Sequence, residues 1–141
     1  MREMPHDLGR FLDAQAATYP DVVAELRRGR KVSHWMWFIF PQLAGLGHSS
    51  MSRRFAIKSL EEARAYLDDP VLGIRLRKSA QALLAISGKS AADIFGWIDA
   101  IKLRSSMTLF HLAAPDEELF VEVLARYYAG VADPVTEALL A

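Results

Sequence analysis

Cationic and aromatic side chains stand next to each other in one stretch of this sequence. The stretch holds a basic run and then an aromatic block: Arg27, Arg28, Arg30 and Lys31, followed by Trp35, Trp37, Phe38 and Phe40. Basic groups hold phosphate or carboxylate by charge-assisted hydrogen bonds, and tryptophan rings are stacking surfaces for nucleobases or cations. The pattern therefore indicates either a core anchor with a charged edge or a pocket for an anionic ligand that carries a ring.

Polar groups at both ends of the aromatic block favour a binding site. His34 directly precedes the block, and Gln42 follows it after Pro41. We therefore predict that Lys31, His34, Trp35 and Gln42 bind a ligand. The alternative interpretation places the aromatic residues in the core, because aromatic side chains bury large areas in small domains.

A second polar cluster lies in an otherwise apolar stretch expected to be helical. Ser105 and Ser106 are three and four residues after Lys102, so all three share a helix face. Burying such groups without partners is costly, which favours an anion site made by these three residues. Two alternatives are a Ser–Lys dyad in which Lys102 is the base for Ser106, and a structural role with the lysine in solvent.

We expect these two segments to meet around one polar pocket for a small anion with a ring, such as a nucleotide or ADP-ribose fragment. An alternative function is hydrolysis of a glycosidic bond in an ADP-ribosyl or nucleoside substrate, which needs a carboxylate as acid or base. Asp99, one helical turn before Lys102, is the candidate for that role. A third alternative is an interaction module, such as a homodimer formed through exposed aromatic residues.

Metal and cofactor chemistry have no sequence support. The four histidines form no pair spaced i, i+4 and no His-Glu-x-x-His motif, so no metal site is predicted. The absence of cysteine excludes disulfides, thiolate zinc sites and a cysteine nucleophile. Gly45-Leu46-Gly47 lacks the rest of a dinucleotide fingerprint, so no cofactor is predicted.

Composition limits the partners and the compartment. With 17 basic and 17 acidic residues the formal net charge is zero, which argues against a protein that grips long nucleic acid. The longest apolar run, residues 35–40, is far shorter than the roughly 20 residues that span a bilayer. No signal-like apolar stretch begins the sequence, and a chain without cysteine suits a reducing compartment, so we expect a soluble cytoplasmic protein.

Apolar residues recur with helical period along most of the chain. The expected helices begin near Asp7, Tyr19–Pro20, Ser59, Asp69–Pro70, Ile98, Pro115 and Asp133–Pro134. Ser59 and Glu62 have capping-box spacing, and the breakers Pro41, Gly45 and Gly47 predict a segment over about 30–53 that is irregular or forms a short helix. Because no convincing pair of strands is found, we predict an all-α single domain over residues 1–141 with six to seven helices.

The same motifs resemble a bacterial family of unknown function, DUF1810, some of whose members carry a calpastatin label that does not describe them. The matching segments include Gly29–Lys31, Ser33–Leu43, Gly45–Gly47, Ser59–Ala63, Ile94–Gly96, Lys102–Leu103 and Ser105–Phe110. The resemblance covers almost the whole chain and implies a compact helical domain, without an established activity or catalytic residues. The order of helices from Ser59 to Leu124 is also similar, at the level of the fold alone, to the NADAR superfamily that handles NAD and ADP-ribose derivatives.

Overall fold

Helices account for all the regular structure in the part of the chain that the computed structural model describes, residues 5–141. In chain order these are the 3-10 turn η1 (Pro5–Asp7) and α1 (Gly9–Ala16), α2 (Tyr19–Arg28), α3 (Met36–Ile39), α4 (Ser50–Arg54), α5 (Leu60–Asp68), α6 (Leu72–Ala85), α7 (Ala91–Ala113), α8 (Glu118–Tyr128) and α9 (Pro134–Leu140). The all-α prediction is confirmed. The predicted number of six to seven is wrong, since residues 5–141 hold nine α-helices. The two additional helices are the short α3 and α4, which fall in the segment expected to be irregular or to form a short helix.

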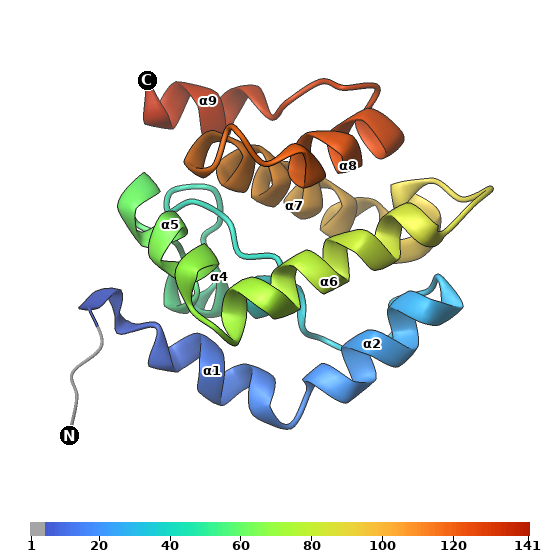
Figure 1. Cartoon of the computed structure of the whole chain (residues 1–141), viewed down its shortest axis with the longest axis horizontal. Helices are drawn as coiled ribbons and strands as arrows, with labels where there is room; N and C mark the ends of the chain where they lie inside the picture. Colours follow the sequence, from blue (N-terminus) through green and yellow to red (C-terminus); the bar gives the residue numbers. More distant parts are fainter. Residues whose placement is uncertain (1–4) are drawn as a thin grey trace.

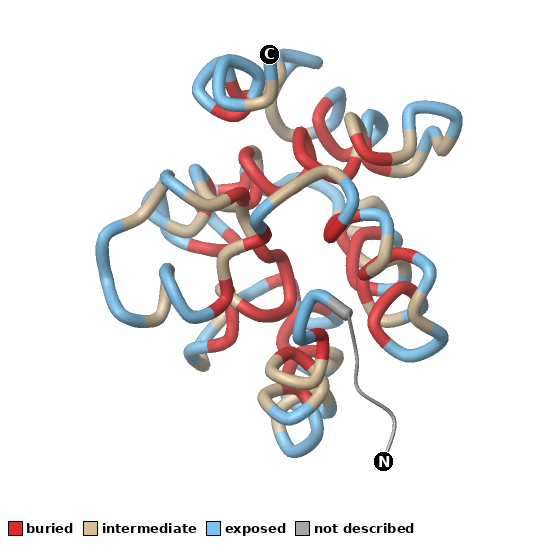
Figure 2. Tube along the Cα trace, turned by 90° about the vertical axis from the view of Figure 1, so that its left-hand side faces the viewer, coloured by how far each residue is buried: buried red, intermediate tan, exposed pale blue. Residues whose placement is uncertain are grey.

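Helix α6 runs through the middle of the molecule, with α1 and α2 on one side of it and α7, α8 and α9 on the other (Figure 1). Helix α7 packs along α8 and also contacts α5 and α9, while α6 contacts α2, α5 and α8. The inward faces of these helices carry the buried residues (Figure 2). The six largest fully buried side chains among the described residues are all aromatic: Trp35, Tyr66, Phe11, Phe40, Phe110 and Phe120.

The aromatic block of residues 35–40 belongs to the core. Trp35, Phe38 and Phe40 are buried, and the block forms the single turn α3. The chain then pairs briefly with the stretch before α5 through an isolated parallel bridge between Leu43 and Ile57. The core interpretation is thus confirmed for these side chains, although Trp37 stays partly exposed. The block does not form the open aromatic patch that would favour an interaction module.

Local capping signals explain several of the helix starts. The Ser59 hydroxyl accepts a hydrogen bond from the backbone N–H of Glu62 (3.1 Å), as predicted. The Glu62 carboxylate, however, accepts from the backbone N–H of Lys58 (3.0 Å), so the reciprocal bond to Ser59 is not made. The Asp133 carboxylate accepts from the backbone N–H of Thr136 (3.1 Å) and caps α9. The helix expected to begin near Asp7 starts at Gly9, and Asp7 does not cap it, because Asp7 lies in η1 with a positive φ of 50°.

The carboxylate of Glu25 joins α2 to the chain that leads into α3. Glu25 is only 3% exposed. It accepts hydrogen bonds from the backbone N–H groups of Val32 (2.6 Å) and Ser33 (2.8 Å). The Ser33 hydroxyl (2.6 Å) and Trp35 Nε1 (3.0 Å) donate to it as well. Burial opposes ionisation, but these donors outweigh it and lower the pKa of Glu25 from 4.5 to about 2.

Gly96 divides α7 into two helical parts. Its backbone angles, φ 77° and ψ 156°, fall in a region that is essentially restricted to glycine. The first part carries a capping box in which Ser90 and Asp93 bind each other's backbone N–H. The change of direction at Gly96 leaves Phe95, before it, buried and Trp97, after it, on the surface.

Replacement of Glu25 tests the link between α2 and residues 32–35. We expect Glu25→Gln to lower the free energy of unfolding at pH 7 by about 3 kcal/mol, because the ionised form supplies that much when its pKa falls from 4.5 to about 2. The folded pKa is below the unfolded one, so this contribution is complete above pH 4.5 and is lost as the pH falls towards 2. Urea unfolding followed by circular dichroism between pH 7 and pH 2.5 measures both effects.

The matched control is Glu122→Gln, which removes an exposed carboxylate on α8. It should keep the wild-type stability and acid dependence. An acid dependence in Glu25→Gln equal to that of the wild type would contradict the assigned role.

Gly96→Ala should destabilise the fold by about 1–3 kcal/mol, because alanine rarely adopts the backbone angles of this position. A Cβ atom at Gly96 would meet no heavy atom within 4 Å, so the loss would come from the backbone and not from a clash. The control is Gly9→Ala in α1, also without neighbours within 4 Å but without a positive φ. It should be neutral or stabilising by about 0.4–1 kcal/mol. Thermal and urea unfolding of both variants distinguish these outcomes.

Candidate functional site

Asp99 brings together two lysines that lie far apart in the sequence. Its Oδ2 is 2.9 Å from Lys31 Nζ, and its Oδ1 is 3.1 Å from Lys102 Nζ. Lys102 is one turn after Asp99 on α7, whereas Lys31 reaches α7 from the segment after α2. The backbone N–H of Lys31 also donates to the carbonyl of Ile94 (2.7 Å), so both its main chain and its side chain are attached to α7.

Each lysine of this cluster lies over a tryptophan ring. Lys31 Nζ is 5.1 Å from the ring centroid of Trp35, and Lys102 Nζ is 4.9 Å from that of Trp37. The quadrupole of an indole ring attracts a cation over its face, and the attraction strengthens where water is excluded. The Lys31 side chain is only 7% exposed, so it is in the more shielded position. The rings and Asp99 together hold both ammonium groups in place.

An open hollow of about 380 Å³ lies next to this cluster. It is lined by Lys31, His34, Trp37, Phe95, Gly96, Trp97, Ile98, Asp99 and Lys102. Trp97 is 69% exposed. The hollow thus combines charged groups at one part of its wall with apolar and aromatic surface from α7.

The structure brings three of the seven predicted ligand-binding residues to this hollow, namely Lys31, His34 and Lys102. Trp35 is 0% exposed and lies beneath Lys31, with its Nε1 bound to Glu25. It therefore supports the site from within the core and does not line it.

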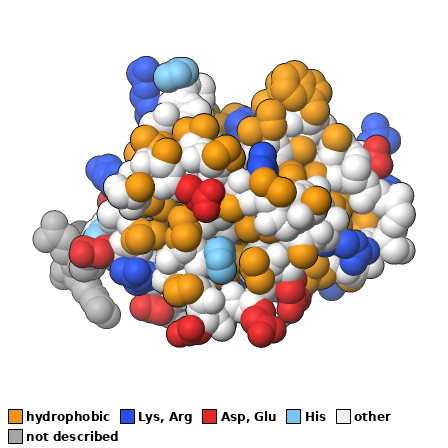
Figure 3. All heavy atoms as spheres, turned by 90° about the horizontal axis from the view of Figure 1, so that it is seen from above, with side chains coloured by type: hydrophobic (Ala, Val, Ile, Leu, Met, Phe, Trp, Pro, Cys, Tyr) orange, Lys and Arg blue, Asp and Glu red, His pale blue; other side chains and the backbone are white. Residues whose placement is uncertain are grey.

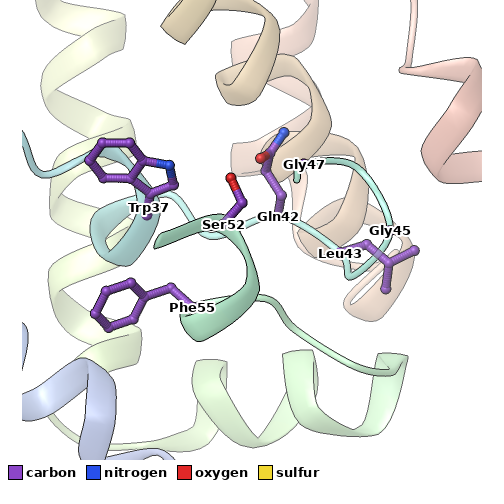
Figure 4. Close-up of a pocket in the computed structure, with 7 residues that line it drawn as sticks. All are labelled: Trp37, Gln42, Leu43, Gly45, Gly47, Ser52 and Phe55. Atoms are coloured by element: carbon purple, nitrogen blue, oxygen red, sulfur yellow. The ribbon is translucent and has the colours of Figure 1, made fainter. Parts of the chain in front are cut away.

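Gln42 lies in a different and much smaller hollow, shown in Figure 4. That hollow has a volume of about 10 Å³, roughly the space of one water molecule. Trp37 lines both hollows, and its indole nitrogen lies on the side of the ring that faces Ser52 and Gln42 (Figure 4). This nitrogen is buried and has no hydrogen-bond partner among the described residues.

The two serines of α7 do not line the hollow beside Lys102. The Ser105 hydroxyl donates to the carbonyl of Ile101 (3.2 Å) and to Asp133 Oδ2 (3.0 Å) at the start of α9. Ser106 is fully buried, and its hydroxyl has no partner among the described residues. Neither serine lines the hollow, and Lys102 pairs with Asp99 instead, so the contacts do not support a Ser–Lys dyad.

Sequence reasoning did not include Phe95, Gly96 or Trp97 in the site. A signal for them was present: Ser90 and Asp93 have the spacing of an N-terminal cap, and Gly96 interrupts an apolar stretch of helical period. Together these signals predict a short helical turn that ends before Trp97, so that the Trp97 side chain points in a different direction from those of the turn.

Neither a metal site nor a membrane-spanning helix is found among residues 5–141. No group of three or more histidine, aspartate or glutamate side chains could hold a metal ion there. None of the helices described is both long and apolar enough to pass through a membrane. On the side of α8 and α9, exposed hydrophobic side chains cover much of the face, with charged groups between and around them (Figure 3). The possibility of a homodimer stays a prediction.

Comparisons with known proteins show the family but supply no residue roles. The family model described as "Protein of unknown function (DUF1810)" matches residues 5–140. A conserved hypothetical protein of Mycobacterium tuberculosis, Rv1873, whose crystal structure was solved at 1.38 Å, is 52% identical with a TM-score of 0.96, over 97% of this chain and 98% of that chain. No curated protein matches. The expected similarity to the NADAR superfamily is not shown, and the chain belongs to the DUF1810 family of proteins of unknown function.

Proposed function

We propose that this protein binds a small anionic ligand that carries a ring, of the nucleotide or ADP-ribose type, in the hollow beside Lys31 and Lys102. The proposal rests on one observation: the ammonium groups of Lys31 and Lys102 share the single carboxylate of Asp99. Lys31 and Lys102 contribute two positive charges, and Asp99 offsets one of them. The cluster therefore keeps an excess of one positive charge at the wall of the hollow.

The hydrogen-bonding capacity of the lysines supports an anionic ligand. An ammonium group has three donors, and each lysine is paired with one oxygen of Asp99. Donors are therefore left on both groups for phosphate or carboxylate oxygens. Since the Lys31 side chain is shielded from water, a charge-assisted bond to it is stronger than one on an open surface.

The size and the apolar part of the hollow support a ring on the ligand. About 380 Å³ lies within the roughly 300–1,000 Å³ range of small-molecule sites. Trp97 offers a largely exposed indole next to the charged groups, and Ile98 adds apolar surface. A base stacked on an aromatic side chain contributes about 1–3 kcal/mol, so a ring placed there would add to the binding of the anion.

A ligand panel tests the proposal by isothermal titration calorimetry with AMP, ADP-ribose, ribose 5-phosphate and adenosine. We expect saturable binding by the compounds that have both a base and phosphate, and weaker binding by the two that lack one of them. Lys102→Met should weaken binding at least tenfold, because it removes one of the two cations that face the anion. Trp97→Ala should weaken it by about 1–3 kcal/mol, the usual contribution of one stacked base.

Matched controls remove groups of the same kind elsewhere. Lys58→Met takes away an exposed lysine outside the hollow, and Val135→Ala an exposed apolar side chain of α9. Both should bind as the wild type does. The proposal fails if no compound of the panel binds at millimolar concentration, or if Lys58→Met weakens binding as much as Lys102→Met.

A hydrolase acting on a glycosidic bond is the second candidate, supported by the position of the Asp99 carboxylate in the wall of the hollow. Against it, both carboxylate oxygens are engaged by ammonium groups, so accepting a proton would disrupt an ion pair. If the protein only binds, incubation with AMP or ADP-ribose should release no free adenine, as measured by chromatography. Release that is lost in Asp99→Ala, with binding retained, would instead establish the hydrolase.

A further inference from the structure

A long groove lies between α2 and α6, which run side by side (Figure 1). It consists of two hollows, of about 500 Å³ and about 300 Å³. The two hollows share Leu26, Arg27 and Ala82 in their walls, so they adjoin each other. On α2 the lining runs from Tyr19 to Gly29 and covers the whole helix, whose ten residues correspond to about 15 Å.

The rim of the groove is basic along its length. Arg28 and Lys89 line the larger hollow, Lys78 lines the smaller one, and Arg27 lines both. None of the lining residues is acidic. Among the described residues no ion pair or side-chain hydrogen bond involves Arg27, Arg28 or Lys78, whereas Lys89 Nζ donates to the carbonyl of Gly29 (3.0 Å). In a chain of zero net charge, this is a local excess of uncompensated cations.

Beneath its charged rim, the groove is lined mainly by apolar side chains. Leu26 and Ala82 lie where the two hollows join, Val23 lines the smaller one, and Ile86 the larger. Ser79 also lines the smaller hollow. It is 3% exposed, and its hydroxyl is buried without a hydrogen-bond partner among the described residues. Cations stabilise the C-terminal end of a helix, which explains the presence of Arg27 and Arg28 at the end of α2. It does not explain Lys78 on α6 or the buried Ser79 hydroxyl that has no partner among the described residues.

We propose that this groove binds an acidic amphipathic helix of a partner protein. An amphipathic helix places apolar side chains three or four residues apart into a groove of this kind and keeps its charged residues at the rim. Two adjoining hollows suit two such apolar anchors. Glutamate and aspartate on the flanks of the same helix would then face Arg27, Arg28 and Lys78.

The distribution of charge favours this occupant over a lipid-like anion. A fatty acid or an alkyl phosphate has one anionic group at one end, whereas the cations here are spread from one end of the groove to the other. A flat anionic membrane would not fill the two hollows. The groove shares no lining residue with the hollow beside Lys31 and Lys102, so this proposal is independent of the ligand proposed there.

A displayed library of 16-residue helical peptides, randomised among Glu, Asp, Lys, Leu and Ala, tests the proposal with the whole protein as target. Counter-selection uses the double variant Arg27→Glu with Lys78→Glu, two exposed residues whose replacement leaves the core intact. We expect enrichment of acidic sequences with leucines spaced three or four residues apart. The most enriched peptide should bind in fluorescence anisotropy and lose at least tenfold in affinity for the double variant.

The control Arg53→Glu reverses an exposed charge on α4, away from the groove, and should bind the peptide as the wild type does. Ala82→Phe, which fills the junction of the hollows, should weaken binding while circular dichroism stays unchanged. The proposal is overturned if the library gives no enrichment over the double variant, or if Arg53→Glu weakens binding equally. Tighter binding of decanoate, of phosphatidylglycerol vesicles or of a single-stranded oligonucleotide than of any selected peptide, lost in the double variant, would also overturn it.

Discussion

The buried carboxylate of Glu25 fixes the path of the chain between α2 and α3. Its four hydrogen bonds fall on three residues in one short segment, Val32, Ser33 and Trp35. With that segment fixed, the backbone of Lys31 meets α7 at Ile94, and its ammonium group reaches Asp99. A carboxylate with four donors is stable in the core, because the hydrogen bonds replace the water that it has lost. The candidate site therefore depends on an acidic group that is not part of it.

The left-handed turn at Gly29 divides the basic run of the sequence between two surfaces. Arg27 and Arg28, before the turn, line the groove between α2 and α6. Lys31, after it, enters the hollow beside α7. Basic residues that are close together in the sequence therefore belong to two separate positive surfaces. The groove between α2 and α6 has an apolar wall, and the hollow beside α7 has an aromatic one. The zero net charge of the chain conceals both, since a sum over 17 basic and 17 acidic residues does not show where the charges lie.

How far the sequence predicts the structure depends on the range of the interactions involved. Helix signals that act within one turn, such as Ser59 and Asp133, are confirmed, whereas the local signal at Asp7 is wrong. There, Arg10 binds the backbone carbonyls of His6 (2.8 Å) and Asp7 (2.7 Å), and η1 precedes the helix.

Contacts between distant segments could be predicted only in part. Helical spacing placed Asp99 one turn from Lys102, and the polar groups of both segments suggested that Lys31 would come near them. The same reasoning placed Ser105 with Lys102, but Asp133, 28 residues away in sequence, attracts that hydroxyl instead. Asp99 shows why such contacts are hard to predict. In the sequence it is a single acid that resembles a catalytic group, whereas in the structure its carboxylate holds the two lysine ammonium groups close together. Without it, Lys31 and Lys102 would repel each other, and the two ammonium groups would no longer be held together at the wall of the hollow.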